Sequence, residues 1–269
     1  MRADVHITYC LTAHLDDAAV RAAVAELAPD ERARHDRLMR ERDRRDFAVA
    51  HALLRRALSA RGDRAPHEWT FTTSAFGKPA LTPDAAARTR LSFNVAHTDG
   101  LVACAVARGV EIGIDVEAVD RRADALGLAA RFFSPSEVAE LQRCADDTRL
   151  LRFIEVWTLK EAYVKALGKG LSCPLHEFAF SFDDPQSLRF ESSHASSPAA
   201  WWFALFAPSD RYRMAIGIGS ESSLEPQIAV YNYHHDDQFL DRLLPLRTTA
   251  ATSSSSSKSH ANAARVETT

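Results

Sequence analysis

Apolar residues recur every three or four positions in two long segments of the chain, 45–58 and 151–167. This spacing places them along one face of an α-helix. Shorter runs alternate apolar and polar residues or are almost wholly apolar, which is typical of β-strands. These runs are 69–73, 101–107, 112–117, 178–182 and 212–219. The pattern predicts an α+β protein with two long amphipathic helices and several strands.

The predicted helices and strands recur in a similar order in the two halves of the chain. The segment 27–31 (LAPDE) resembles 133–137 (FSPSE), and the two lie 106 positions apart. We therefore expect two α+β halves, 1–109 and 110–246, related by a pseudo-twofold axis, each with a long helix packed on a small antiparallel sheet. A cleft between them would be a preferred ligand site. Because the identities are sparse, chance similarity is the alternative.

Composition and charge narrow the class of protein. The chain is 46% hydrophobic and 26% charged, which is typical of a globular protein, and its net charge of −3 gives no attraction to nucleic acid or anionic membrane. We expect no signal peptide and no membrane span, because no apolar run of the required length occurs. The four cysteines form no CxxC pair, which favours a reduced, cytoplasmic protein.

The serine-rich segment 247–269 is predicted to be a disordered tail.

Two carboxylates share one face of a predicted strand. In 112–117 (IGIDVE), apolar residues alternate with Asp115 and Glu117, so both acids project from the same side. They repel each other unless solvent or a cation intervenes. Mg²⁺ binds through one or two carboxylates together with substrate phosphates, which makes the pair a candidate metal site. The alternative is the solvated face of an edge strand, because Asp-x-Glu is a common pattern.

A second charged pair lies near the end of the predicted helix 151–167. Glu161 and Lys165 stand at positions i and i+4, on one face of the helix. An ordinary surface ion pair has the same spacing and contributes only about 0.2–0.5 kcal/mol. The functional interpretation makes Glu161 a third metal ligand or a base, and Lys165 a cation for phosphate oxygens.

Five short motifs follow one another along the chain. They are Gly-Lys-Pro at 77–79, Phe-Asn-x-x-His-Thr at 93–98, Gly-Ile-Asp-x-Glu at 113–117, Phe-Phe-Ser-x-x-Glu at 132–137 and Trp-x-x-Lys-Glu-x-x-x-Lys at 157–165. In this combination the chain resembles the Sfp-type 4′-phosphopantetheinyl transferases, over about residues 20–220. The resemblance implies a monomeric pseudo-dimer that transfers the 4′-phosphopantetheine moiety of coenzyme A to a serine of an apo acyl or peptidyl carrier protein. It also implies dependence on Mg²⁺ and release of 3′,5′-ADP.

The resemblance assigns the reaction chemistry to four residues. It implies that Asp115, Glu117 and Glu161 hold Mg²⁺ on the pyrophosphate of coenzyme A. Glu161 is also the candidate base for the carrier serine, and Lys165 would neutralise charge on the phosphate oxygens.

The resemblance implies further contacts with coenzyme A. Lys78 and His97 correspond to residues that hold the adenosine 3′-phosphate and neighbouring groups. A family arginine of the first long helix falls at Arg45, although the register also permits Asp46. Ala96 departs from the family pattern, because many relatives have serine at this position.

Other interpretations stay open. A non-catalytic family member would bind coenzyme A or a carrier protein without transfer, and an Mg²⁺-dependent nucleotide hydrolase could use the same carboxylates. The segment 132–143 is a candidate docking site for the carrier, with Phe132 and Phe133 either as apolar anchors or as core residues. The motifs do not indicate which carrier is modified.

Overall fold

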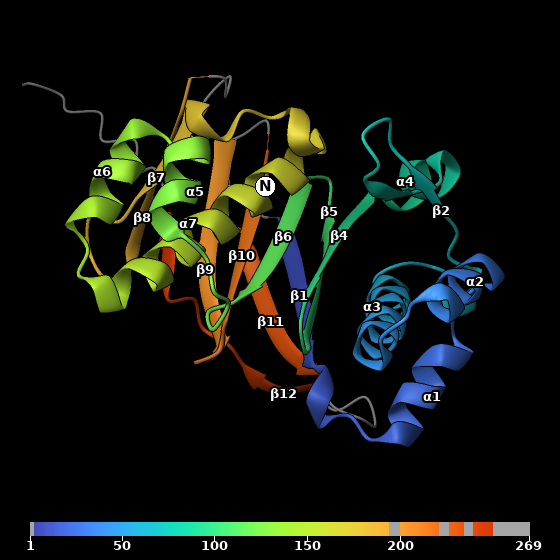
Figure 1. The fold of residues 1–269 in the computed structure, drawn as a ribbon. Coiled ribbons are helices and arrows are strands. Elements are labelled where there is room, and N and C mark those ends of the chain that lie inside the picture. The colour runs from blue at the N-terminus through green and yellow to red at the C-terminus, as the bar shows by residue number, and fades with distance from the viewer. Residues whose placement is uncertain (1–2, 194–199, 221–225, 234–238, 250–269) are drawn as a thin grey trace, which may run out of the picture.

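The structure is a computed structural model that describes residues 3–193, 200–220, 226–233 and 239–249 (Figure 1). The α-helices of this part of the chain are α1 (Asp17–Ala25), α2 (Pro29–Arg37), α3 (Glu41–Ser59), α4 (Pro83–Thr89), α5 (Ala125–Phe132), α6 (Pro135–Arg143) and α7 (Asp146–Leu167). Its strands are β1 (Asp4–Leu11), β2 (Phe71–Thr73), β3 (Pro79–Leu81), β4 (Leu91–Thr98), β5 (Leu101–Arg108), β6 (Glu111–Ala118), β7 (Phe178–Ser181), β8 (Ser187–Ser192), β9 (Trp201–Ser209), β10 (Tyr212–Gly219), β11 (Gln227–Tyr233), β12 (Phe239–Arg242) and β13 (Arg247–Thr249). The predicted long helices correspond to α3 and α7. None of the described helices is both long and apolar enough to cross a membrane.

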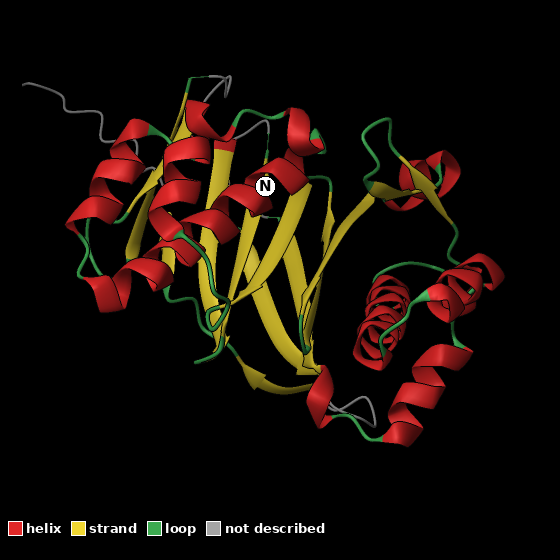
Figure 2. Cartoon of the chain, in the orientation of Figure 1, coloured by secondary structure: helices red, strands yellow, loops and turns green. Residues whose placement is uncertain are grey.

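Two β-sheets pack face to face, and each carries one long helix on its other face (Figure 2). The five-stranded sheet has the order β12-β11-β1-β5-β4, and the six-stranded sheet has the order β6-β10-β9-β13-β8-β7. Helix α3 packs on the first sheet and α7 on the second. Buried apolar residues of β1, β5, β6, β9 and β10 fill the space between the sheets. Strands β2 and β3 form a separate two-stranded sheet.

Strand β5 is buried on both faces, which explains its almost wholly apolar sequence. Val102 and Cys104 belong to the core under α3, whereas Leu101 and Ala103 belong to the core between the sheets. Because successive side chains of a strand point to opposite faces, a strand covered on both sides needs apolar residues at every position.

The two halves repeat the same order and pairing of elements. Strand β1 pairs with β5 and β5 with β4, all antiparallel, and β6, β10 and β9 pair in the same way. The similar segments 27–31 and 133–137 lead into α2 and α6, each with a proline in the first turn. Glu31 and Glu137 both accept a hydrogen bond from the backbone N–H three residues earlier. The predicted α+β fold with two similar halves is therefore confirmed.

The strands after residue 226 depart from the predicted division of the chain. Strand β11 lies within the predicted half 110–246, but it pairs in parallel with β1 of the other half. Strand β12 pairs with β11, so both strands extend the first sheet. Strand β13 lies between β9 and β8, so the prediction of a disordered tail from residue 247 is wrong for Arg247–Thr249. A three-residue strand is too short to show a period, and its hydrogen-bonding partners are distant in sequence. Residues 250–269 lie outside the described part.

Candidate active site

Gly113 allows α7 to lie directly against β6. A Cβ atom at this position would stand 2.1 Å from the carbonyl oxygen of Ala162 and 2.2 Å from the amide nitrogen of Ala166, both in the backbone of α7. Glycine is therefore required at this point of close approach. Because side chains alternate along a strand, Asp115 and Glu117 share the face of Gly113 and lie on the side of β6 that meets α7.

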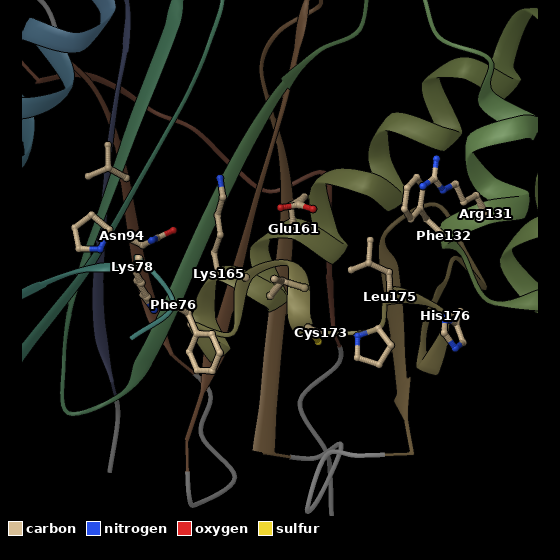
Figure 3. Close-up of a pocket in the computed structure, with 17 residues that line it drawn as sticks. Phe76, Lys78, Asn94, Arg131, Phe132, Glu161, Lys165, Cys173, Leu175 and His176 are labelled. Atoms are coloured by element: carbon tan, nitrogen blue, oxygen red, sulfur yellow. The ribbon is translucent and has the colours of Figure 1, made fainter. Parts of the chain in front are cut away.

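Asp115 and Lys165 form the central ion pair of the site. The Nζ atom of Lys165 lies 2.6 Å from Oδ1 of Asp115, with 8% of the Asp115 side chain and 31% of the Lys165 side chain exposed. Glu161 lies one turn before Lys165 on α7 and is half-buried. Figure 3 shows Glu161 and Lys165 projecting from the same helix into one cavity.

Burial raises the pKa values of Asp115 and Glu161, and neighbouring carboxylate charges add to the shift. Burial raises the pKa of Asp115 to about 7; the ammonium of Lys165 opposes this shift, and the charges of Glu117 and Glu161 add to it. Burial also raises the pKa of Glu161, again opposed by Lys165 and increased by Glu117. The Oδ2 atom of Asp115 is buried and has no hydrogen-bond partner. A further positive charge beside these carboxylates would therefore be stabilising.

The carboxylates fit a divalent cation whose coordination the substrate completes. Among the described residues, no group of three or more His, Cys, Asp or Glu side chains is arranged to enclose a metal ion by itself. Glu117 also accepts a hydrogen bond from Nη1 of Arg121 at 2.9 Å. Mg²⁺ is commonly held by one or two carboxylates, water and substrate phosphates, so a complete protein cage is not required. The unpartnered Oδ2 of Asp115 is a suitable ligand atom for it.

A cavity of about 480 Å³ opens over Glu161 and Lys165. Its lining comes from both halves of the chain, with the loop after β2 on one side and the end of α5 and the segment after α7 on the other (Figure 3). The lining residues that Figure 3 labels are Phe76, Lys78, Asn94, Arg131, Phe132, Glu161, Lys165, Cys173, Leu175 and His176. Asn94 also joins the two sheets, because its Oδ1 accepts a hydrogen bond from the amide of Ile114 at 2.8 Å.

Comparison with known proteins identifies the family. One family model, described as 4′-phosphopantetheinyl transferase, N-terminal, matches residues 16–108, and another, described as the 4′-phosphopantetheinyl transferase superfamily, matches residues 111–217. The 4′-phosphopantetheinyl transferase HetI of Nostoc sp. (strain PCC 7120) is 32% identical over 194 residues, which is 72% of this chain and 79% of that protein. The chain belongs to the 4′-phosphopantetheinyl transferase superfamily. The transferase is also 28% identical to the 4′-phosphopantetheinyl transferase Sfp of Bacillus subtilis (strain 168) over 192 residues, or 71% of this chain and 81% of that relative.

In the transferase, backbone carbonyl groups hold the ammonium group of Lys78. Its Nζ donates hydrogen bonds to the carbonyl oxygens of Ile112 and Ala166, each at 3.1 Å. Ala166 lies in the last turn of α7, where a cation interacts favourably with the helix dipole. Burial lowers the pKa of Lys78, and the nearby charge of Glu111 opposes this shift. Lys78 lines the cavity, and its predicted contact with a phosphate stays a prediction.

Arg45 and His97 do not line this cavity. Nη2 of Arg45 lies 3.6 Å from the carboxylate of Asp17, and 26% of the arginine side chain is exposed. His97 is exposed on β4. Asp46 is buried and accepts a hydrogen bond from the hydroxyl of Thr12 at 2.5 Å. Of the two register alternatives, only Arg45 presents its charge to solvent.

Several residues of the site received no role from the sequence. Asn94 belongs to the Phe-Asn-x-x-His-Thr motif, but the motif does not indicate its hydrogen bond to Ile114 in the second sheet. Lys160 lies in the last motif and is fully buried, whereas 173–176 belongs to no motif and forms part of the cavity wall. Ala96, where many relatives have serine, packs in the core between the sheets.

Proposed function

We propose that this transferase moves the 4′-phosphopantetheine moiety of coenzyme A to a serine hydroxyl of an apo acyl or peptidyl carrier protein, with release of 3′,5′-ADP. The observation that carries the proposal is the single cavity containing Glu161 and Lys165, with Asp115 in contact with Lys165. Matched segments span 61%, 79% and 82% of the length of three curated relatives, so the comparison covers most of a transferase of this kind.

Asp115, Glu117 and Glu161 would hold Mg²⁺ together with the pyrophosphate of coenzyme A. The bound cation would supply charge neutralisation to the pyrophosphate and to the departing 3′,5′-ADP. The buried, unpartnered Oδ2 of Asp115 and the pKa values of Asp115 and Glu161, which burial raises, support this assignment, because a cation bound beside buried carboxylates would stabilise their charged forms.

Glu161 would accept the proton of the attacking serine, and Lys165 would neutralise phosphate charge. Glu161 is the candidate proton acceptor because its carboxylate lines the cavity in which the serine would attack. Lys165 is half-buried at the cavity and already faces one carboxylate, so its ammonium is fixed in place before a phosphate arrives. Phosphoryl transfer depends mainly on such positioning and charge neutralisation.

The remaining contacts with coenzyme A follow the family assignment. Lys78 at the cavity wall and His97 on β4 would hold the adenosine 3′-phosphate and neighbouring groups, and Arg45 on α3 would be a further contact with coenzyme A. The resemblance also implies that the protein acts as a monomer.

The carrier would dock beside the cavity at the start of the segment 132–143. Phe132 lines the cavity and is half-buried, and Arg131 beside it supplies a positive charge. Phe133 is only 4% exposed and packs with Phe153, so it is a core residue rather than an anchor.

The test is the intact mass of an apo carrier domain incubated with the protein, coenzyme A and Mg²⁺, with an EDTA control. A metal-dependent gain of one phosphopantetheine group supports the proposed reaction. Binding of coenzyme A with no gain on several carrier types would favour a non-catalytic binder. Consumption of coenzyme A without labelling of any carrier would point to a hydrolase.

A further inference from the structure

Lys160 is a fully buried lysine one residue before Glu161. Its Nζ lies 2.8 Å from Oε2 of Glu137 and donates hydrogen bonds to the carbonyl oxygens of Leu175 at 2.7 Å and Phe178 at 2.6 Å. Burial lowers the pKa of Lys160, and the adjacent charge of Glu137 opposes this shift. The ammonium therefore has one carboxylate and two carbonyl partners, which together use its three donor protons.

Glu137 connects the same lysine to two other elements. Its Oε2 accepts from the backbone N–H and the hydroxyl of Ser134, each at 2.9 Å, at the start of α6. Its Oε1 accepts from the amide of Phe180 in β7 at 2.9 Å. The pair thus joins α6, α7, β7 and the segment that precedes β7.

The first half of the chain contains a similar buried pair. Arg55 of α3 lies 2.9 Å from Glu31 and donates to the carbonyl oxygens of Pro66 at 3.1 Å and Trp69 at 2.8 Å. As in the second half, the cation of the long helix holds two carbonyl groups that are three residues apart. An arginine in the first half thus makes contacts of the same kind as Lys160 does in the second half.

Only the pair in the second half holds a wall of the cavity over Glu161. Leu175, whose carbonyl Lys160 binds, lines this cavity together with Cys173 and His176. In Figure 3 these residues lie on the other side of Glu161 from Lys78. The same lysine fixes the turn of α7 that carries Glu161.

We propose that Lys160 and Glu137 are positioning residues, which hold the segment 173–178 as the cavity wall and thereby set the affinity for coenzyme A. Neither residue lines the cavity. The claim about affinity for coenzyme A rests on the proposed function, whereas the claim that the pair holds the segment 173–178 in place does not. Loss of the lysine leaves two carbonyl groups and a carboxylate buried without their partner, so the segment opens more readily.

Cys173 reports on the wall directly, because it lies in the segment and is half-buried. The experiment measures its alkylation rate by N-ethylmaleimide through peptide mass spectrometry, as a function of pH. The rates are compared per thiolate, because burial raises the pKa of the Cys173 thiol and the charge of Lys160 opposes this shift. Cys144, which is also half-buried but lies outside the cavity, is the internal reference. In Lys160→Met we expect the ratio of the Cys173 rate to the Cys144 rate to rise by about tenfold, since local opening becomes easier.

Kinetics with coenzyme A and an apo carrier domain give the second readout. We expect Lys160→Met to raise KM for coenzyme A by about tenfold and to lower kcat by less, because Glu161 and Lys165 are still present. Lys160→Arg should restore most of the wild-type value, because Arg55 makes the corresponding contacts with a glutamate and two carbonyl groups in the first half.

Glu155→Gln is the matched control on the same helix. Glu155 is 8% exposed and lies 3.3 Å from Arg152 and 3.4 Å from Arg213, and none of the three lines the cavity. This variant removes a buried carboxylate charge from α7, and we expect wild-type alkylation ratio and wild-type KM.

A wild-type alkylation ratio and a wild-type KM in folded Lys160→Met would overturn the positioning role and leave the pair as a stabilising contact only. Glu137→Gln replaces it under the same criteria if Lys160→Met does not fold. Alkylation requires no turnover, so a raised ratio supports the ordered wall even when the wild-type protein modifies no carrier. Failure of the wild-type protein to modify any carrier would refute the proposed function but not the positioning role of Lys160 and Glu137.

Discussion

Replacement of Gly113 by alanine tests whether the close approach of α7 to β6 builds the active site. The added Cβ would stand 2.1 Å from the carbonyl oxygen of Ala162, whereas an ordinary contact begins at 3.4 Å. The helix and the strand must therefore separate by up to about 1.3 Å, because neither contacting atom belongs to a side chain that can rotate away. This separation would move Lys165 on α7 away from Asp115 on β6, whose charged atoms now lie 2.6 Å apart.

We expect Gly113→Ala to lower both activity and stability. A displacement of about 1 Å in a catalytic group can reduce turnover by roughly 10²-fold. Overpacking of a core contact lowers the free energy of unfolding by about 1–3 kcal/mol. The assay is kcat/KM for carrier modification at saturating Mg²⁺, with urea denaturation of the same preparation.

Gly219→Ala is the control on the neighbouring strand β10. Its added Cβ would meet ring atoms of Trp201 at 2.8–3.0 Å, and a ring can shift more easily than a helix backbone. We expect a smaller loss of stability and a wild-type kcat/KM. The reasoning is refuted if Gly113→Ala retains wild-type kcat/KM and wild-type stability, or if the two variants lose activity equally.

Three further predictions follow from the charged residues. Glu161→Ala and Lys165→Ala should each lower kcat by about 10²–10³-fold with a nearly unchanged thermal midpoint, and near-normal turnover in either would remove that residue from the chemistry. Asp115→Asn should raise the Mg²⁺ concentration for half-maximal activity by at least about tenfold, and an unchanged metal titration would exclude Asp115 as a ligand. Burial alone would raise the pKa of Glu31, but hydrogen bonds from His51, Arg55 and the Ala28 amide lower it from 4.5 to about 2. The stability that Glu31 contributes, on the order of 3 kcal/mol, is therefore present above pH 4.5 and lost as pH falls toward 2. In urea unfolding at a series of pH values, the free energy of unfolding of Glu31→Gln should fall less steeply below pH 4.5 than that of the wild type.

The sequence pattern was sufficient to predict the two long helices and the strands that correspond to β2, β5, β6, β7 and β10. The long helices α3 and α7 were visible because one face of each is buried, which forces apolar residues to recur with the helical period. Strand β5 was visible because burial on both faces requires an unbroken apolar run. The repeat was visible through α2 and α6, since proline in the first turn and a glutamate that caps the helix are local requirements.

The candidate site was determined only in part. The motifs identified Asp115, Glu161 and Lys165, which the structure brings together across the contact between β6 and α7. Arg45 and His97 lie outside the cavity, and their roles depend on the resemblance alone. The sequence pattern contains the residue types but no information about the distances between them.

Three features follow from the packing of whole elements: the pairing of Lys160 with Glu137, the carbonyl partners of Lys78 and the addition of β11 to the first sheet. Each joins groups far apart in the chain, so its formation depends on how whole elements pack rather than on a local period. The raised pKa of Asp115 has the same origin, because desolvation is a property of the surrounding elements. The spacing of apolar residues along a helix or strand indicates which of its faces is buried. Which other element covers that face depends on how the elements pack.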